Sequence, residues 1–211
     1  MVADRPANSP HVVPMTEAHL PRVTQVMARA FHREPIMQYT LPDEDDRPGQ
    51  IRWLFGRIAR YAMRYGRAHT TEDVRGFAIW LAPGDPDMQV LRLLRLGIAA
   101  APCRLGYRSV RRLMRFSKVK DALHHRLAPE RHWYLLMLGV DPEAQGGGVG
   151  SALVRPVLEQ ADADGLPCYL ETAVEQNTRI FGKYGFETAG EADLTDTLHL
   201  WGMTRQARQA G

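Results

Sequence analysis

One stretch near the middle of the chain, residues 135–151, constrains the fold more than any other. It reads LLMLGVDPEAQGGGVGS, which is an apolar run typical of a buried strand, a short loop, and then four glycines within five residues. Glycines leave backbone N–H groups uncovered, and the start of a helix carries partial positive charge. A strand that leads into a glycine-rich helix start is therefore suited to a phosphate or pyrophosphate ligand.

Two familiar phosphate sites fit this stretch poorly. A Walker A loop needs a lysine between its last glycine and the following Ser or Thr, and Gly150-Ser151 lacks it. A dinucleotide-binding loop is approximated by Gly146, Gly148 and Ser151, with Glu171 about twenty residues further on. That fingerprint begins directly after its strand, however, whereas residues 141–145 intervene here. The dinucleotide match is weak.

The spacing Gln145-x-x-Gly148-x-Gly150 resembles the Arg/Gln-x-x-Gly-x-Gly/Ala signature of the GNAT superfamily of N-acetyltransferases. The resemblance is strong over residues 132–187 and looser over residues 11–82. We see no counterpart in the family for residues 88–126. Three further segments resemble the family: Gly139-Val140-Asp141-Pro142, Asn177 and Gly185-Phe186-Glu187. A fourth, Leu170-Glu171-Thr172, is similar to the puromycin N-acetyltransferase-like subgroup.

The resemblance implies acetyl-coenzyme A as cosubstrate and no metal. In the family the strand before the loop diverges from its neighbour, and the pantetheine arm lies in the V-shaped gap. Carried over, the thioester would lie between strands 132–140 and 168–173, and amides at the helix start would bind the pyrophosphate. The predicted cofactor-binding residues are Leu138, Gly139, Val140, Gln145, Gly146, Gly147, Gly148, Val149, Gly150, Ser151 and Asn177.

Acetyl transfer to an amine requires a neutral amine, a stabilised tetrahedral intermediate and a proton for the departing thiolate. Because strand 132–140 has no carboxylate, Glu171 on the opposing strand is the predicted catalytic residue, acting as the base. A role for Glu171 in binding a cationic substrate, or in local hydrogen bonding, stays open. An N–H group near Leu138 or Val140 would stabilise the oxyanion.

The proton donor is where the chain departs from the family. Family members commonly read Tyr-x-x-x-Gly-Phe, and the tyrosine protonates the thiolate; Phe181 takes that place here. Tyr184 lies one helical turn later, and we expect it to be a packed aromatic with its hydroxyl at the edge. Whether Phe181 abolishes or reroutes protonation of the thiolate stays open.

The hydropathy pattern predicts a single α/β domain over residues 11–205, after a tail at residues 1–10. The expected fold is a mixed central sheet with flanking helices, strand splay at the cofactor site and a helical insertion at about residues 88–126. The expected strands are 11–15, 68–71, 74–81, 132–140, 168–173, 186–189 and 197–204. The expected helices are 16–32 with Thr16 as N-cap, one from about Ile51 after a loop at 41–49, two within 88–126, 148–162 and 176–184.

Residues 88–126 hold ten Lys or Arg and one acidic residue, Asp121, a net charge of +9; since the whole chain carries +3, the remainder carries −6. The pattern favours a solvated basic face on helices that pack over the substrate cleft. Attraction of an anionic acceptor or of the coenzyme's phosphates, and binding to nucleic acid or a membrane surface, are the other interpretations. We expect no nucleic-acid partner. His124 and His125, adjacent on a helix and about 100° apart, predict a poor metal pair.

The polar N-terminus has no apolar signal segment, and Arg92 and Arg95 interrupt the most apolar stretch, so we expect no membrane span. Two cysteines without a CxxC pair fit a reducing cytoplasm. The predicted function is transfer of an acetyl group from acetyl-coenzyme A to a primary amine of a small molecule. A protein or peptide N-acetyltransferase and a non-catalytic acyl-coenzyme A-binding protein are the alternatives. The acceptor and the oligomeric state, including a homodimer, stay open.

Overall fold

The computed structural model of the protein describes residues 10–84, 87–128 and 130–208, so the predicted tail lies outside it apart from residue 10. Seven strands of the described chain form one sheet in the order β1-β2-β3-β4-β5-β7-β6. The pair β4–β5 is parallel and the other neighbours are antiparallel, which confirms the mixed sheet. The strands are β1 (Val12–Pro14), β2 (Gly66–Thr71), β3 (Gly76–Leu81), β4 (Trp133–Val140), β5 (Cys168–Thr172), β6 (Glu187–Thr195) and β7 (Leu198–Arg205).

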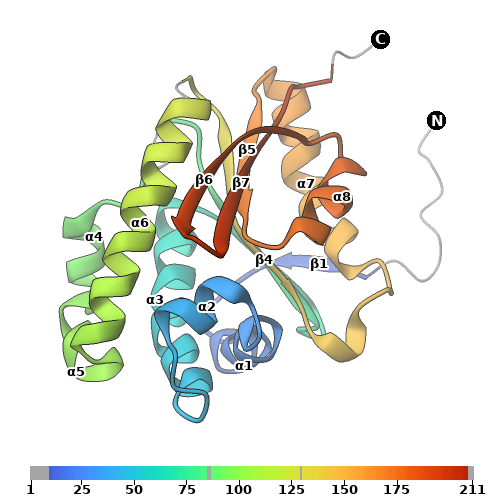
Figure 1. Ribbon diagram of the computed structural model, residues 1–211. Coiled ribbons are helices and arrows are strands. Elements are labelled where there is room, and N and C mark those ends of the chain that lie inside the picture. Colours follow the sequence, from blue (N-terminus) through green and yellow to red (C-terminus); the bar gives the residue numbers. More distant parts are fainter. Residues whose placement is uncertain (1–9, 85–86, 129, 209–211) are drawn as a thin grey trace.

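Helices cover both faces of this sheet (Figure 1). Alternate residues of β3 show the two layers, because Phe77 and Ile79 pack with α1 and α3, while Ala78 and Trp80 pack with α7. Among the described residues, no helix is long and apolar enough to cross a bilayer. The helices are α1 (Leu20–Phe31), α2 (Pro35–Thr40), α3 (Arg47–Tyr65), α4 (Val90–Arg95), α5 (Ala101–Leu105), α6 (Tyr107–Leu127), α7 (Val149–Asp164) and α8 (Glu175–Gly182), with 3₁₀ turns at Ile98–Ala100 and Pro142–Ala144.

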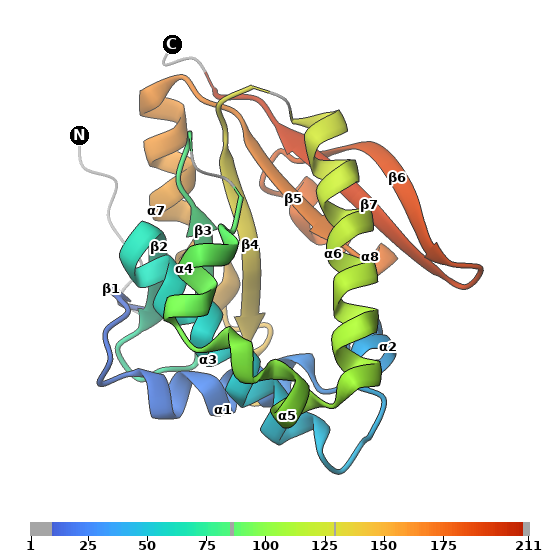
Figure 2. The same ribbon diagram turned by 90° about the vertical axis from the view of Figure 1, so that its left-hand side faces the viewer.

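The centre of the sheet opens between β4 and β5 (Figure 2). These two strands pair from Trp133 to Leu135, whereas β4 stays paired with β3 as far as Val140. A register shift in the β3–β4 ladder falls opposite Leu136, where the pairing with β5 ends. Such a bulge bends a strand. The predicted splay of the central strands is therefore present.

Several predicted boundaries are wrong, for local reasons. Helix α1 begins at Leu20 rather than after Thr16, because the residues between form a turn in which the Thr16 N–H donates to His19 Nδ1 at 3.1 Å. Helix α2 was not predicted, although Pro35 is its first residue and Glu34 caps it by accepting from the Met37 N–H. Helix α3 begins at Arg47, within the predicted loop. Strand β6 is longer than expected and forms a twisted hairpin with β7.

Candidate active site

A large cavity lies between the open end of the β4–β5 pair and the helices on the α3 side of the sheet. Its volume is about 840 Å³, and most of its lining is apolar. We call it the central cavity. Its walls come from β4 and β5 (Leu135–Leu138, Leu170–Ala173), α8 (Asn177, Phe181), the N-terminal helices (Phe31, Glu34, Met37, Phe55) and the segment 88–121 (Leu93, Leu105, Leu113, Phe116, Lys120).

The open edge of β4 exposes the backbone groups that the sequence predicted. The N–H of Asp141 donates to the Arg75 carbonyl in the chain leading to β3, at 2.8 Å. Because backbone groups alternate in direction along a strand, the N–H and C=O groups of Val140 and Leu138 point the other way, where β5 has diverged. The backbone N–H and C=O groups of Gly139 therefore point toward β3. Gly139 also leaves room for the Phe77 ring, because a Cβ at this position would lie 2.6 Å from that ring.

The loop after β4 presents its glycines to open space. Gly146 and Gly148 both adopt left-handed backbone angles, with φ of 81° and 77°, and no described atom lies within 4 Å of a Cβ built on either. Gly148 is the N-cap of α7 and makes no side-chain cap, so the first amides of the helix remain available. An uncovered loop at a helix start, next to an open strand edge, fits a pyrophosphate joined to an extended arm.

The other predicted cofactor residues surround this loop. Gly147, Val149 and Gly150 lie in the loop or in the first turn of α7. The side chain of Gln145 reaches the Val140 carbonyl at 3.5 Å. Ser151 shares a hydrogen bond of 2.8 Å with the Tyr184 hydroxyl, and Asn177 donates to Thr172 Oγ1 at 3.1 Å while also lining the central cavity.

Glu171 lies where β5 separates from β4, and it lines the central cavity. Its Oε2 accepts a hydrogen bond of 2.6 Å from the Tyr134 hydroxyl, which in turn accepts one of 3.1 Å from Lys120 Nζ. Its Oε1 is buried, and the Tyr169 hydroxyl lies close enough to Glu171 to lower the pKa of the carboxyl by hydrogen bonding. Burial raises the pKa of Glu171, while the Lys120 charge and the Tyr134 hydroxyl oppose that rise. A carboxylate held in this way can act as a general base.

Sequence reasoning missed three residues of this arrangement. Tyr134 appeared as part of an apolar strand, and Lys120 as one of many basic residues on a helix. Glu34 was missed with α2; it lines the same cavity, and burial raises its pKa to about 7. Tyr134 lies one residue from the end of the β4–β5 pairing, and no local pattern in the sequence singles it out.

Phe181 lies on the wall of the central cavity, and its side chain has no proton to donate. Tyr184 is not among the residues that line the cavity, and its hydroxyl bonds Ser151. The predicted interpretation of Tyr184 as a packed aromatic with its hydroxyl at the edge agrees with this contact.

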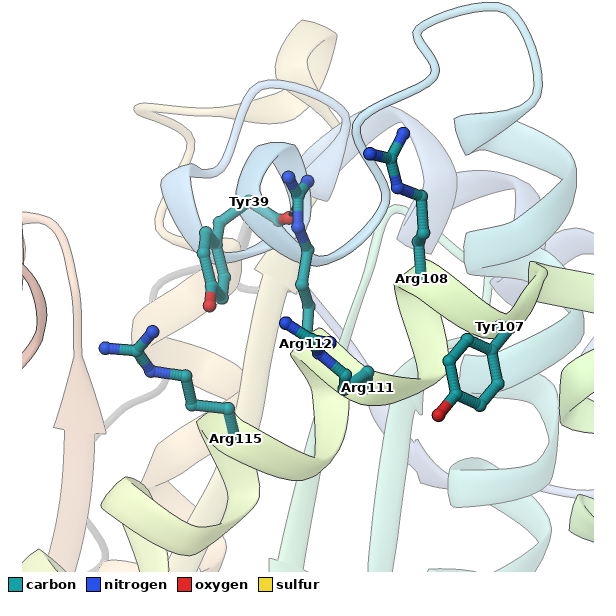
Figure 3. Close-up of a pocket in the computed structure, with 6 residues that line it drawn as sticks. All are labelled: Tyr39, Tyr107, Arg108, Arg111, Arg112 and Arg115. Atoms are coloured by element: carbon teal, nitrogen blue, oxygen red, sulfur yellow. Dashed lines mark hydrogen bonds between the residues drawn. The ribbon is translucent and has the colours of Figure 1, made fainter.

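A second pocket, of about 470 Å³, is lined largely by arginines of the basic segment (Figure 3). Arg112 donates to the Tyr39 carbonyl of α2 at 2.9 Å. The other arginines come from the same end of α6 and are exposed. The segment is thus basic on its outside and mostly apolar toward the central cavity, which it also lines with Lys118, Lys120 and Asp121. The pocket is lined by Tyr39, Tyr107, Arg108, Arg111, Arg112 and Arg115.

Comparison with known proteins identifies sequence relatives. The acetyltransferase (GNAT) family model matches residues 103–186. An uncharacterized N-acetyltransferase of Schizosaccharomyces pombe is 29% identical over 173 residues, which are 78% of this chain and 69% of the relative. Since the family match begins in α5, the expectation that residues 88–126 have no counterpart in the family is wrong for the part from residue 103 onward.

Solved structures share the fold. A structure described as histone acetyltransferase HPA2 and related acetyltransferase, from Corynebacterium glutamicum, has a TM-score of 0.71 at 23% identity, covering 96% of this chain and 98% of that one. Arylalkylamine N-acetyltransferase 2 from Aedes aegypti has a TM-score of 0.65 at 16% identity, covering 94% and 99%. An agmatine N-acetyltransferase has a TM-score of 0.61 at 11% identity, covering 92% and 98%.

The family model and the Schizosaccharomyces pombe relative show sequence similarity to acetyltransferases, and the solved structures show the same fold. Together with the splayed strands and the glycine loop, they support a GNAT-superfamily acetyltransferase.

Proposed function

We propose that the protein transfers an acetyl group from acetyl-coenzyme A to a primary amine of a small molecule. The central cavity carries this proposal, because it joins the open edge of β4 to a large, mostly apolar chamber with three carboxylates on its wall, those of Glu34, Asp121 and Glu171. Within the superfamily we retain the likeness of Leu170-Glu171-Thr172 to the puromycin N-acetyltransferase-like subgroup as part of the proposal.

Acetyl-coenzyme A would be held by the backbone. The amides at residues 146–151 would bind its pyrophosphate, and the backbone groups of Leu138 and Val140 that point away from β3 would bind the pantetheine arm along β4. The cosubstrate supplies the activated acetyl group. Asn177 and Phe181, which line the cavity from α8, would border the arm on the β5 side.

Glu171 would remove a proton from the bound ammonium, so that the amine becomes a nucleophile. Tyr134 holds Oε2 in place, and Oε1 is the atom that would receive the proton. The positive charge of Lys120 lowers the pKa of Glu171 against the effect of burial and so favours the ionised carboxylate. An N–H of the open β4 edge would stabilise the oxyanion of the tetrahedral intermediate.

The shape of the acceptor side favours a small amine. The segment 88–121 closes over the sheet with apolar side chains such as Leu93, Leu105 and Leu113, while Glu34 and Glu171 attract a cationic head group. A chamber of this kind suits an amine with an apolar body. Two of the proteins with this fold are an arylalkylamine and an agmatine N-acetyltransferase, which act on small amines by their names.

The test is a panel of acceptors with acetyl-coenzyme A, followed by release of the coenzyme thiol. The panel contains arylalkylamines, alkyl polyamines, and peptides with free N-termini or lysines. Turnover with small apolar amines and none with the peptides is the expected result. Turnover confined to the peptides would reject the small-molecule assignment, and tight coenzyme binding with no turnover on any acceptor would favour a non-catalytic acyl-coenzyme A-binding protein.

A further inference from the structure

Three side chains that could ligate a metal meet where the chain after β3 passes α6. They are Asp87, which precedes α4, and the adjacent His124 and His125 near the end of α6. One ligand atom from each lies within 4.8 Å of the other two. The two imidazole rings are stacked, with 13° between their planes and 5.4 Å between their centroids, so His125 must turn before both rings can direct a nitrogen at one ion. The sequence-based expectation of a poor metal pair stays a prediction.

The hydrogen bonds around His124 fix which of its nitrogens carries the proton. His132 Nδ1 lies 2.6 Å from the Glu130 carbonyl, which can only accept, so Nδ1 of His132 is protonated. In neutral His132 the other nitrogen, Nε2, is then an acceptor, and it lies 2.7 Å from Nε2 of His124. His124 Nε2 must therefore donate, which leaves a free lone pair on His124 Nδ1.

That lone pair is buried and faces a carboxylate. His124 is fully buried, and its Nδ1 has no hydrogen-bond partner among the described residues. Nδ1 lies 3.8 Å from Asp87 Oδ1. Burial, and after it the nearby His132 and Lys120, lower the pKa of His124 to about 3. Two acceptors then face each other, and a cation between them would satisfy both.

We propose that His124 Nδ1, His125 Nε2 and an Asp87 carboxylate oxygen form a binding site for a divalent transition metal, with Zn²⁺ as the reference ion. Two imidazoles and a carboxylate are a donor set that Zn²⁺ accepts, and three protein ligands leave a fourth position for water. His132 takes the part of the outer partner that orients a ligating imidazole, since it accepts the proton of His124 Nε2.

The required adjustment is a rotation of exposed side chains. Ligand atoms around a tetrahedral Zn²⁺ are about 3.3 Å apart, and His125 Nε2 already lies 3.1 Å from Asp87 Oδ2. The side chains of Asp87 and His125 are 53% and 61% exposed, so their rotamers can move toward the buried His124. The metal would link the chain before α4 to α6, and both of these segments line the acceptor side of the central cavity.

The experiment measures Zn²⁺ binding to the full chain, free of any polyhistidine tag, by calorimetry and by competition with a chromogenic chelator. We expect saturable binding of one equivalent and an increase in melting temperature with Zn²⁺ but not with Mg²⁺. Asp87→Ala and His125→Ala, both at exposed positions, should each weaken binding by about tenfold or more.

The matched control is His199→Ala, because His199 forms an exposed pair with Asp193 on the β6–β7 hairpin and has no part in the proposed site. This variant should bind Zn²⁺ as tightly as the parent. Equal weakening in all three variants, binding that survives Asp87→Ala and His125→Ala, or no saturable binding to the parent would each reject the site. Circular dichroism of each variant separates loss of the ligand from loss of the fold.

Discussion

The Tyr134 hydroxyl donates to Glu171 Oε2 at 2.6 Å, near the end of the parallel pairing between β4 and β5. The bond joins the two strands just before they separate, so the carboxylate is fixed at the point where the gap begins. Lys120 reaches the same hydroxyl from α6, which lies over the acceptor side. One hydroxyl thus connects the candidate base, the strand splay and the basic segment.

Replacing Glu171 by Gln tests its proposed role directly. If Glu171 takes the amine proton, kcat should fall by about 10²–10⁴, while the Kd for acetyl-coenzyme A changes little, since the backbone supplies the coenzyme contacts. Steady-state kinetics and coenzyme titration measure the two quantities. Glu175→Gln, an exposed glutamate at the start of α8, is the control and should retain full activity. A Glu171→Gln enzyme with normal kcat would remove Glu171 from the chemistry.

Replacing Tyr134 by Phe should shift the pH dependence of the reaction. The Tyr134 hydrogen bond favours the ionised carboxylate and lowers the pKa of Glu171, so its loss raises that pKa further. A base must be deprotonated to work, so the acidic limb of the kcat/KM profile should move to higher pH by roughly one unit.

Lys120→Gln should move the same limb in the same direction, because it removes the positive charge that most opposes protonation of Glu171. Lys183→Gln, at the exposed C-cap of α8, provides the control with an equal change in net charge. A shift of the limb to lower pH in Tyr134→Phe or Lys120→Gln would contradict the assignment of Glu171 as the base.

How much of this site the sequence could predict depends on the range of the interactions. The loop at residues 145–151 is a local feature, and its spacing predicted a glycine turn that leads into a helix at about residue 148, where α7 begins at Val149. Glu171 was predicted because strand 132–140 has no carboxylate and Glu171 lies on the opposing strand. The contacts of Tyr134 and Lys120 join β4 to α6 through tertiary packing, which the hydropathy pattern of a single strand or helix does not predict.

Helix α2 shows the same limit at shorter range. It has six residues, fewer than two turns, so its apolar spacing gives no helical signal, and the capping contact of Glu34 with the Met37 N–H was the available cue. The metal-ligand cluster is another tertiary feature, because Asp87 and His124 are separated by the whole basic segment. A helical wheel placed His124 and His125 apart, whereas their rotamers stack the rings.

Replacing Gly148 by Val tests the loop as the pyrophosphate site. Gly148 has a left-handed backbone, so a β-branched residue there would strain the N-cap of α7 and cover its first amides. We expect the Kd for coenzyme A to rise about tenfold or more. The control is Gly165→Val at the other end of the same helix, where φ is 65° and the space is equally open. It should cost similar stability and leave the coenzyme Kd unchanged; equal Kd values for both variants would place the pyrophosphate elsewhere.

Replacing Glu34 by Gln should change stability in a pH-dependent way. The folded-state pKa of Glu34 is about 7, above its ordinary value of 4.5, so the folded protein binds this proton more tightly than the unfolded chain. The wild type therefore loses stability as the pH rises from about 4.5 to about 7, and the loss is constant above that. Gln keeps an oxygen for the Met37 N–H, so the variant should gain on the order of 1–3 kcal/mol relative to wild type across this window.

Urea titrations of wild type and Glu34→Gln at pH 4.5, 6 and 8 measure this difference. Glu44→Gln is the control, since Glu44 is exposed and the difference for it should stay constant with pH. A Glu34→Gln advantage that shrinks as the pH rises would have the wrong sign and would contradict the burial of an ionisable Glu34.

Replacing Phe181 by Tyr examines the missing proton donor. The Phe181 side chain lies on the wall of the central cavity, so the added hydroxyl has solvent or ligand space before it, and the Kd for coenzyme A should stay within about threefold. Phe186→Tyr is the contrasting variant, because Phe186 is buried in the core under α7, where an unpartnered hydroxyl costs about 1–3 kcal/mol. Coenzyme titration and thermal melting of both variants give the result. Loss of coenzyme binding in Phe181→Tyr, with its melting temperature unchanged, would show that Phe181 does not occupy the place of the family's tyrosine and that thiolate protonation must be sought elsewhere on the cavity wall.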